Sequence, residues 1–447
     1  MRDRILKKYD NGLTLVYKHT KAKQAVFFDI RFHSGLINDP QDKLGLSHFV
    51  EHSVGFSNNK YTNEQKNDFR MKLYYANFST SRTYMRFYAY VSDEEFEETF
   101  AHYINNLTDF NISDQEFENE KLVITQEILR FRKDISAEMH YTTNETLYKD
   151  KNVRVRPFGT VETVNNITKQ DLINYINNCF TLQNCQITVY GNVSFLKVKR
   201  LIKKYVLTAF NKKSSEKYLN IQDVVKYNDD KKVMVVNPSP DEGKSKITII
   251  HKFHMDDINR YRGFATRILS NIYEVSAINY FREKFGLCYA AGIKFSRGLS
   301  IDNSHDVMQM KISVDCDQKN VKTVLEKLPE FYAYIKEYHL TDDSLEQAKT
   351  ILRRYEKVSI NKNIIQKGTD YADAEFDNTP YITYWQNKTY NKKKEKKTTL
   401  DFVKTILKDC LEEKPIILVV SNTTDTLPEY KDLCKDIRKN SKWAKDI

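Results

Sequence analysis

The sequence predicts an α+β fold of two tandem homologous repeats, each a mostly antiparallel sheet covered by helices. One order of elements occurs twice along the 447 residues: two strands, two helices, two strands, several helices and one strand. A polar, lysine-rich segment at 213–231 separates the two occurrences and is typical of a linker. The chain is also too long for one ordinary hydrophobic core. We therefore expect a first domain at 1–212 and a second at 232–447, related by internal duplication.

In the first repeat, strands are predicted where β-branched and aromatic residues gather. These segments are 13–18, 25–32, 73–79, 82–91 and 186–190. Helices are predicted after capping boxes, in which a Ser or Thr is followed three residues later by an acidic residue or Gln. The boxes start at Thr62, Ser92, Ser113 and Thr168.

The second repeat follows the same order with little sequence identity to the first. Strands are predicted at 232–236, 246–252, 287–295, 307–314 and 415–421, and helices at 258–270, 276–285 and after Thr341 and Thr399. The duplication is therefore inferred from the order of elements and not from matched residues.

Composition excludes several classes of protein. The net charge is +11, but the excess is mostly scattered lysine, which is typical of a solvated surface. The dense run Lys392–Lys397 is predicted to be an exposed loop. Six cysteines without a C-x-x-C pair favour free thiols in a reducing compartment. With no signal-like or membrane-length apolar run, we expect a cytoplasmic protein that binds neither membranes nor nucleic acid.

A single motif, H-x-x-E-H, indicates chemistry. It comprises His48, Glu51 and His52 within a stretch of helical character. Residues four apart lie on one face of a helix, so both imidazoles can bind one metal ion. Glu51 points to the same side, where it can take a proton from water activated by the metal. Imidazole and carboxylate ligands suit zinc, although five such residues also occur by chance on ordinary helices.

Two histidines leave zinc one protein ligand short. The best candidate is Glu127, on the helix predicted after Ser113, and Glu120 lies two turns earlier on the same face. One of these carboxylates could bind the metal while the other orients a histidine ligand. Spacing alone favours ordinary solvated glutamates over this arrangement, because the helix carries other glutamates as well.

Together, these segments resemble the pitrilysin/insulinase family of zinc metallopeptidases. The resemblance rests on H-x-x-E-H followed at a distance by the E-x(6)-E pattern of Glu120 and Glu127, and it extends over essentially the whole chain. It implies half of a clamshell, one Zn²⁺ per chain held by His48, His52 and Glu127, Glu51 as general base, and Glu120 as a partner of a ligand. It further implies that peptide substrates lie along Asn77, Phe78 and Ser79, with Phe78 where the family usually has alanine.

The second repeat lacks the zinc motif, but the stretch from Tyr280 to Tyr289 resembles the family's R…GL-x-Y signature. The resemblance implies that Arg282 and Tyr289 act on the substrate, as donors to a developing oxyanion. We expect a zinc endopeptidase for short or unfolded peptides, of the kind that serves as a processing or maturation peptidase. Because the chain has the length of one half-clamshell, we predict a homodimer, with a heterodimer as the competitor. A non-catalytic scaffold subunit is the alternative function.

Overall fold

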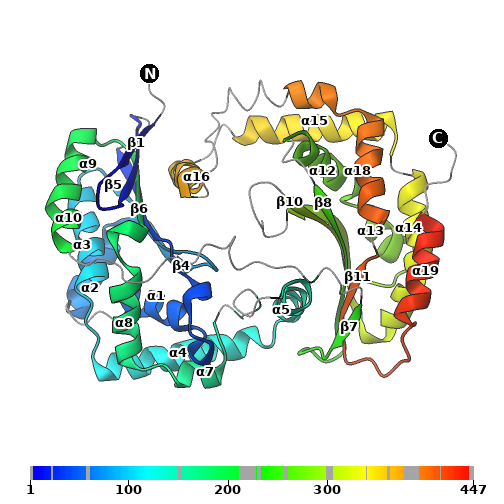
Figure 1. Cartoon of the computed structure of the whole chain (residues 1–447), viewed down its shortest axis with the longest axis horizontal. Coiled ribbons are helices and arrows are strands. Elements are labelled where there is room, and N and C mark those ends of the chain that lie inside the picture. The colour runs from blue at the N-terminus through cyan, green and yellow to red at the C-terminus, as the bar shows by residue number, and fades with distance from the viewer. Residues whose placement is uncertain are drawn as a thin grey trace. The chain divides into compact units, whose positions relative to one another are not determined.

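The computed structural model describes residues 4–21, 24–56, 61–149, 154, 156, 158–210, 228, 233–255, 260–297, 306–338, 340–359, 363–376, 392–412 and 414–441. The chain forms two compact units (Figure 1). The first contains Met1–Leu129, Val155–Asn220 and Asn361–Ile382. The second contains Arg130–Arg154, Ile221–Ile360 and Thr383–Ile447. No helix within the described ranges is long and apolar enough to cross a membrane.

The first unit is built on a six-stranded sheet with the order β1-β2-β6-β3-β5-β4. The neighbours β2 and β6 are parallel and all other pairs are antiparallel. Strand β4 is an edge strand, which leaves one side of its backbone available for pairing. The strands are β1 (Ile5–Lys8), β2 (Thr14–His19), β3 (Ala25–Phe32), β4 (Leu73–Thr80), β5 (Met85–Ser92) and β6 (Cys185–Gly191).

Helices cover one face of this sheet and bury its apolar side chains. The predicted caps at Thr62 and Thr168 are confirmed, since each side chain accepts the backbone N–H three residues later. At Ser92 the predicted position of the helix start was wrong, because the helix begins at Phe96. The Ser92 hydroxyl accepts the backbone N–H of Glu95, which lies just before the helix. The helical segments are η1 (Leu36–Asn38), η2 (Gln41–Lys43), α1 (Leu46–Phe56), α2 (Asn63–Met71), α3 (Phe96–Thr108), α4 (Asp114–Phe131), α7 (Val161–Asn165), α8 (Lys169–Cys179), η3 (Leu182–Asn184), α9 (Phe195–Leu201), η4 (Ile202–Val206) and α10 (Leu207–Ala209).

The second unit repeats this topology. Its strand order is β7-β11-β8-β10-β9, which matches β2-β6-β3-β5-β4 of the first sheet, and β7 and β11 are parallel neighbours as β2 and β6 are. The other pairs are antiparallel. The strands are β7 (Met234–Asn237), β8 (Lys244–Met255), β9 (Ala290–Arg297), β10 (Asp306–Asp317) and β11 (Ile416–Val420). The predicted α+β class and the internal duplication are therefore confirmed.

Helices again cover one face of the second sheet. They are α12 (Arg260–Tyr273), α13 (Ser276–Ile278), η5 (Asn279–Lys284), η6 (Gln318–Asn320), α14 (Val321–Tyr338), α15 (Asp342–Ser359), α18 (Leu400–Glu412) and α19 (Tyr430–Ser441). The lysine run is not the predicted loop, because 392–397 is helical. Lys394 is only 8% exposed there, and Glu395 pairs with Arg353 on α15.

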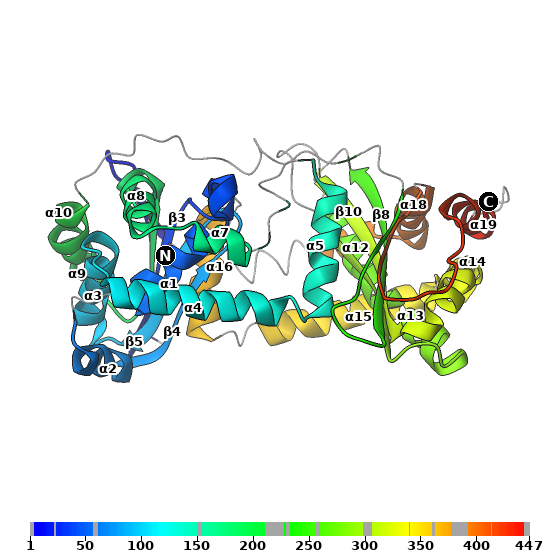
Figure 2. The same cartoon turned by 90° about the horizontal axis from the view of Figure 1, so that it is seen from below.

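The repeats exchange one helix each. Helix α5 (Ile135–Leu147) follows α4 in sequence but packs on β8 and β11 of the second sheet (Figure 2). Helix α16 (Ile364–Phe376) belongs to the second repeat in sequence but packs on β2, β3 and β6 of the first. The domains expected at 1–212 and 232–447 follow the sequence, so they place α5 in the first domain and α16 in the second. The expected linker at 213–231 lies outside the described residues, apart from Asn228, which donates to the backbone of Thr146 and Tyr148.

Candidate metal centre

Helix α1 is held in place at its N-terminus by a buried carboxylate. Asp39 accepts hydrogen bonds from the backbone N–H of Gly45 at 2.9 Å and of Ser47 at 2.9 Å. Burial raises the pKa of Asp39 to about 7, although these hydrogen bonds and that of the Ser47 hydroxyl oppose the rise. Gly45 has φ +96°, and a Cβ there would lie 2.5 Å from the carbonyl oxygen of Phe158. A glycine is therefore required where the chain enters the helix.

The two histidines of α1 meet a glutamate of α4. His48 Nε2 lies 3.8 Å and His52 Nε2 3.7 Å from Glu127 Oε2. One ligand atom from each residue lies within 4.8 Å of the other two. Zinc binds nitrogen and oxygen ligands at about 2.0–2.2 Å, so these separations fit a single ion with little movement. Both histidines are buried, and the Glu127 side chain is 28% exposed, which leaves one side open to solvent.

The two imidazoles of the cluster lie in different electrostatic environments. Burial and the charge of His52 lower the pKa of His48 to about 3, so its imidazole is neutral, the form that binds metal. Among the described residues, His48 Nδ1 is buried without a hydrogen-bond partner. His52 Nδ1 lies 3.3 Å from Glu120 Oε2. Burial opposes protonation of His52, but the Glu120 hydrogen bond and three nearby carboxylates together raise its pKa.

Glu51 is 7% exposed and lies on the same face of α1 as the two histidines. The Thr80 hydroxyl, at the end of β4, donates to Glu51 Oε2 at 2.6 Å. Burial raises the pKa of Glu51, while the Thr80 hydrogen bond opposes the rise. Neither Thr80 nor Asp39 was singled out from the sequence. A half-buried threonine or a buried aspartate has no local pattern that reveals its distant partner.

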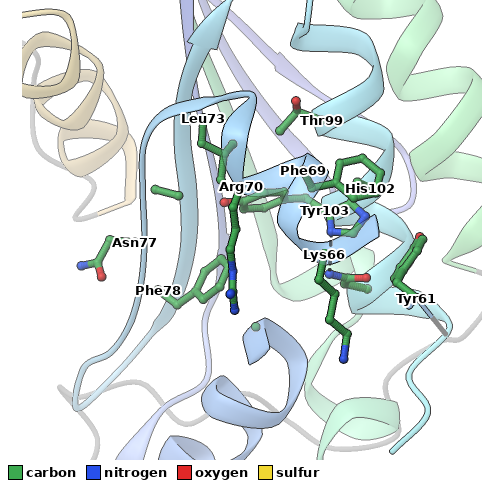
Figure 3. Close-up of a pocket in the computed structure, with 13 residues that line it drawn as sticks. Tyr61, Lys66, Phe69, Arg70, Leu73, Asn77, Phe78, Thr99, His102 and Tyr103 are labelled. Carbon is green, nitrogen blue, oxygen red and sulfur yellow. Dashed lines mark hydrogen bonds between the residues drawn. The ribbon is translucent and has the colours of Figure 1, made fainter. Parts of the chain in front are cut away.

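The predicted substrate segment forms part of edge strand β4. Phe78 faces α1: its ring packs against Phe87 at 5.5 Å and Tyr103 at 5.6 Å between ring centroids. A Cβ on Gly55 of α1 would lie 2.4 Å from the Phe78 ring, so the large side chain fits because Gly55 has none. Asn77 points away from this face (Figure 3). Ser79 is half-buried and pairs with Arg86 in the ladder.

The second unit brings Arg282 and Tyr289 together. Arg282 Nη1 donates to the backbone oxygen of Tyr289 at 3.4 Å, next to the start of β9. The Tyr289 side chain is 46% exposed, and burial and Asp315 raise its pKa, so its hydroxyl stays a donor at neutral pH. Both side chains are therefore accessible on this unit, and their action on a substrate stays a prediction.

The chain belongs to the pitrilysin/insulinase family, peptidase family M16. The family model described as Insulinase (Peptidase family M16) matches residues 14–160, which contain the whole histidine–glutamate cluster. The model described as Peptidase M16 inactive domain matches residues 166–352. The predicted family is confirmed, and the second match begins within the first repeat, before β6.

Several relatives are named as zinc proteases. The chain is 25% identical to the zinc protease PqqE of Helicobacter pylori over 200 residues, 44% of this chain and 45% of that protein. It thus matches less than half the length of this relative. It is 22% identical to an uncharacterized zinc protease of Rickettsia felis over 385 residues, 82% and 87% of the two chains. Over 44% of the chain it is 24% identical to a probable mitochondrial-processing peptidase subunit beta of Schizosaccharomyces pombe, of which 43% is covered.

Solved structures show the same fold at low identity. The periplasmic protease PqqL of Escherichia coli matches 100% of this chain with a TM-score of 0.79 and 15% identity, over 51% of its own length. A protease from Helicobacter pylori matches 94% of the chain and 99% of its own with a TM-score of 0.70 and 17% identity.

Proposed function

We propose that this protein is a zinc-dependent endopeptidase that cleaves short or unfolded peptides. The observation that carries the proposal is the meeting of two imidazoles and one carboxylate from α1 and α4, with Glu51 beside them. The zinc protease names of several relatives support it. We further propose one Zn²⁺ per chain, with His48, His52 and Glu127 as its ligands.

When bound, zinc supplies a Lewis acid that lowers the pKa of water towards about 7. Glu51 accepts the proton of the attacking water and passes it to the leaving amine. The raised pKa of its buried carboxyl suits it to hold that proton. The Thr80 hydroxyl fixes the carboxyl, and Glu120 fixes the ring of His52.

An extended peptide would add to edge strand β4 through main-chain hydrogen bonds, which tolerate many sequences. Arg282 and Tyr289 would then donate to the carbonyl oxygen as it becomes an oxyanion. We propose that a second copy of the chain, or a related chain, completes the enclosure of the peptide.

All six cysteines are free thiols, which supports the proposed cytoplasmic location.

A non-catalytic subunit is the second candidate, because the model matched by 166–352 is described as an inactive domain. Glu51→Gln separates the two candidates. As a peptidase, the variant should keep about one zinc per chain and lose on the order of 10³-fold in kcat, measured by mass spectrometry on a mixed peptide pool. Parent protein that binds zinc and cleaves nothing in the pool would favour the non-catalytic role.

A further inference from the structure

A pocket of about 260 Å³ lies beside the metal cluster in the first unit (Figure 3). It is enclosed by α1, α2, α3 and β4 and is lined by Gly55, Tyr61, Phe69, Phe78, Tyr103 and His102, with Lys66 and Arg70 among the further lining residues. Five of the thirteen lining residues carry an aromatic or imidazole ring. His102 is neutral, because burial lowers its pKa to about 4, and its ring stacks on Phe69 at 3.6 Å between ring centroids.

The pocket adjoins the proposed catalytic groups on two elements. Gly55 lies three residues after His52 on α1, which is about 4.5 Å along the helix axis. Phe78 lies two residues before Thr80, whose hydroxyl holds Glu51, and this is about 7 Å along the strand. An extended peptide paired with β4 advances about 3.3 Å per residue. The pocket therefore lies about two residues from the bond that Glu51 would serve.

The lining residues carry two cations and no carboxylate. Lys66 is already paired, with its Nζ 3.3 Å from Glu116 Oε1. Arg70 is exposed and forms no ion pair with any residue that the structure describes. Both side chains extend from α2 in the same direction (Figure 3). A guanidinium at an aromatic-walled pocket suits a carboxylate, which it can bind through two parallel hydrogen bonds, and it repels lysine and arginine.

We propose that this pocket binds a carboxylate of the peptide substrate, with Arg70 as the specificity-determining residue. The carboxylate belongs to a glutamate side chain, whose methylene groups pass along Phe78 and Phe69, or to the C-terminus of a short peptide. The Phe78 ring limits the width of the pocket, since it occupies the space that Gly55 leaves by having no side chain. The inference rests on the proposed peptidase function and deepens it by naming the substrate class.

The test starts from one peptide that the zinc-loaded protein binds. Each position of this peptide is changed in turn to Glu, Gln or Lys, and the peptides are made with free and with amidated C-termini. The kcat/KM of the parent is compared with that of Arg70→Glu. Arg200→Glu is the matched control, because Arg200 is exposed on α9 and pairs with Glu97 away from the pocket.

At one position we expect Glu to exceed Gln by about tenfold and Lys to be poorest, because a hydrogen bond from a guanidinium to a carboxylate is stronger than one to a neutral amide. Arg70→Glu should reverse the order of Glu and Lys, and Arg200→Glu should leave it unchanged. A preference lost on amidation would assign the carboxylate to the C-terminus. Equal rates for Glu, Gln and Lys at every position, with free and amidated ends alike, would overturn the proposal.

Equilibrium binding of the same peptides to Glu51→Gln, followed by fluorescence anisotropy, separates this inference from the proposed function. A preference for Glu that is lost in the Glu51→Gln/Arg70→Glu double variant supports the pocket even if the parent cleaves nothing. Binding that ignores both the peptide charge and Arg70 refutes the pocket even if the parent is an active peptidase.

Discussion

Helices α1 and α12 occupy equivalent places in the two repeats: α1 follows β3 and α12 follows β8, and these strands hold the same place in the orders β2-β6-β3-β5-β4 and β7-β11-β8-β10-β9. Helix α1 buries His48, Glu51 and His52 beside α4. Helix α12 buries Phe264, Ala265, Ile268, Leu269 and Tyr273 in the core of the second unit. The fold is thus shared while the chemistry is not. A few side chains on one helix, and not the architecture, decide which repeat can hold a metal.

The exchanged helices differ in a comparable way. Helix α5 docks through apolar contacts, with Met139 and Leu147 against β8 and β11. Helix α16 adds a charged network: Asp373 binds the buried Arg31 at 2.7 Å, and Arg31 also pairs with Asp29. Arg86 pairs with Asp29 at 2.7 Å and donates to Thr369 at 2.7 Å. The contacts of α16 therefore include ion pairs with buried side chains, which the apolar cluster around α5 does not.

The largest expected effect tests whether α1, and not α12, holds the metal. His52→Ala removes a ligand and should reduce zinc from about one per chain to near zero, with loss of cleavage. Asn271→Ala on α12 is the control and should retain the parent's zinc. Metal content after gel filtration, with circular dichroism to confirm folding, measures both. Equal zinc in His52→Ala and the parent would remove His52 from the ligand set.

The next effect tests whether the second repeat takes part in catalysis at all. Tyr289→Phe should lower kcat on the order of 10²-fold with zinc content unchanged, because one donor to the developing oxyanion is lost. Steady-state kinetics on a cleaved peptide would show it. If the variant matched the parent in kcat, Tyr289 would have no role in catalysis and would be only a surface residue just before β9.

A smaller effect tests whether Glu120 on α4 supports the zinc ligand His52. Glu120→Gln removes the charge that orients His52 while leaving all three ligands in place, so zinc affinity should fall about 10–100-fold. Competition with a zinc chelator measures the affinity. Glu118→Gln, on the same helix and exposed, is the control. Unchanged affinity in Glu120→Gln would leave that glutamate a solvated surface residue.

The smallest effect compares the two exchanged helices. Asp373→Asn should lower the free energy of unfolding by about 0.5 kcal/mol, since Asp373 is 47% exposed and Arg31 keeps Asp29. The loss should shrink at 1 M salt, where exposed charges are screened. Denaturant midpoints at two salt concentrations, with Asp425→Asn as control, measure it. A loss that does not change with salt would mean that Asp373 acts through packing.

The sequence by itself determined the repeat order, most helix starts and the three residues of the zinc motif. Strand alternation, capping boxes and helical spacing are local patterns, so they could be read without knowing any distant contact. The resemblance to a known family then indicated Glu127 as a ligand and Glu120 as its neighbour. Spacing alone could not distinguish either glutamate from a solvated surface residue.

Only the tertiary structure decided which groups meet across the chain. It set Thr80 against Glu51 and Asp39 against the start of α1. It also buried Asp29 and Arg31, which alternate with apolar residues in β3 and read as solvent-facing until α16 covers them. The physical reason is range: periodicity fixes the face of one element, whereas the partner of that face depends on packing between segments far apart in sequence.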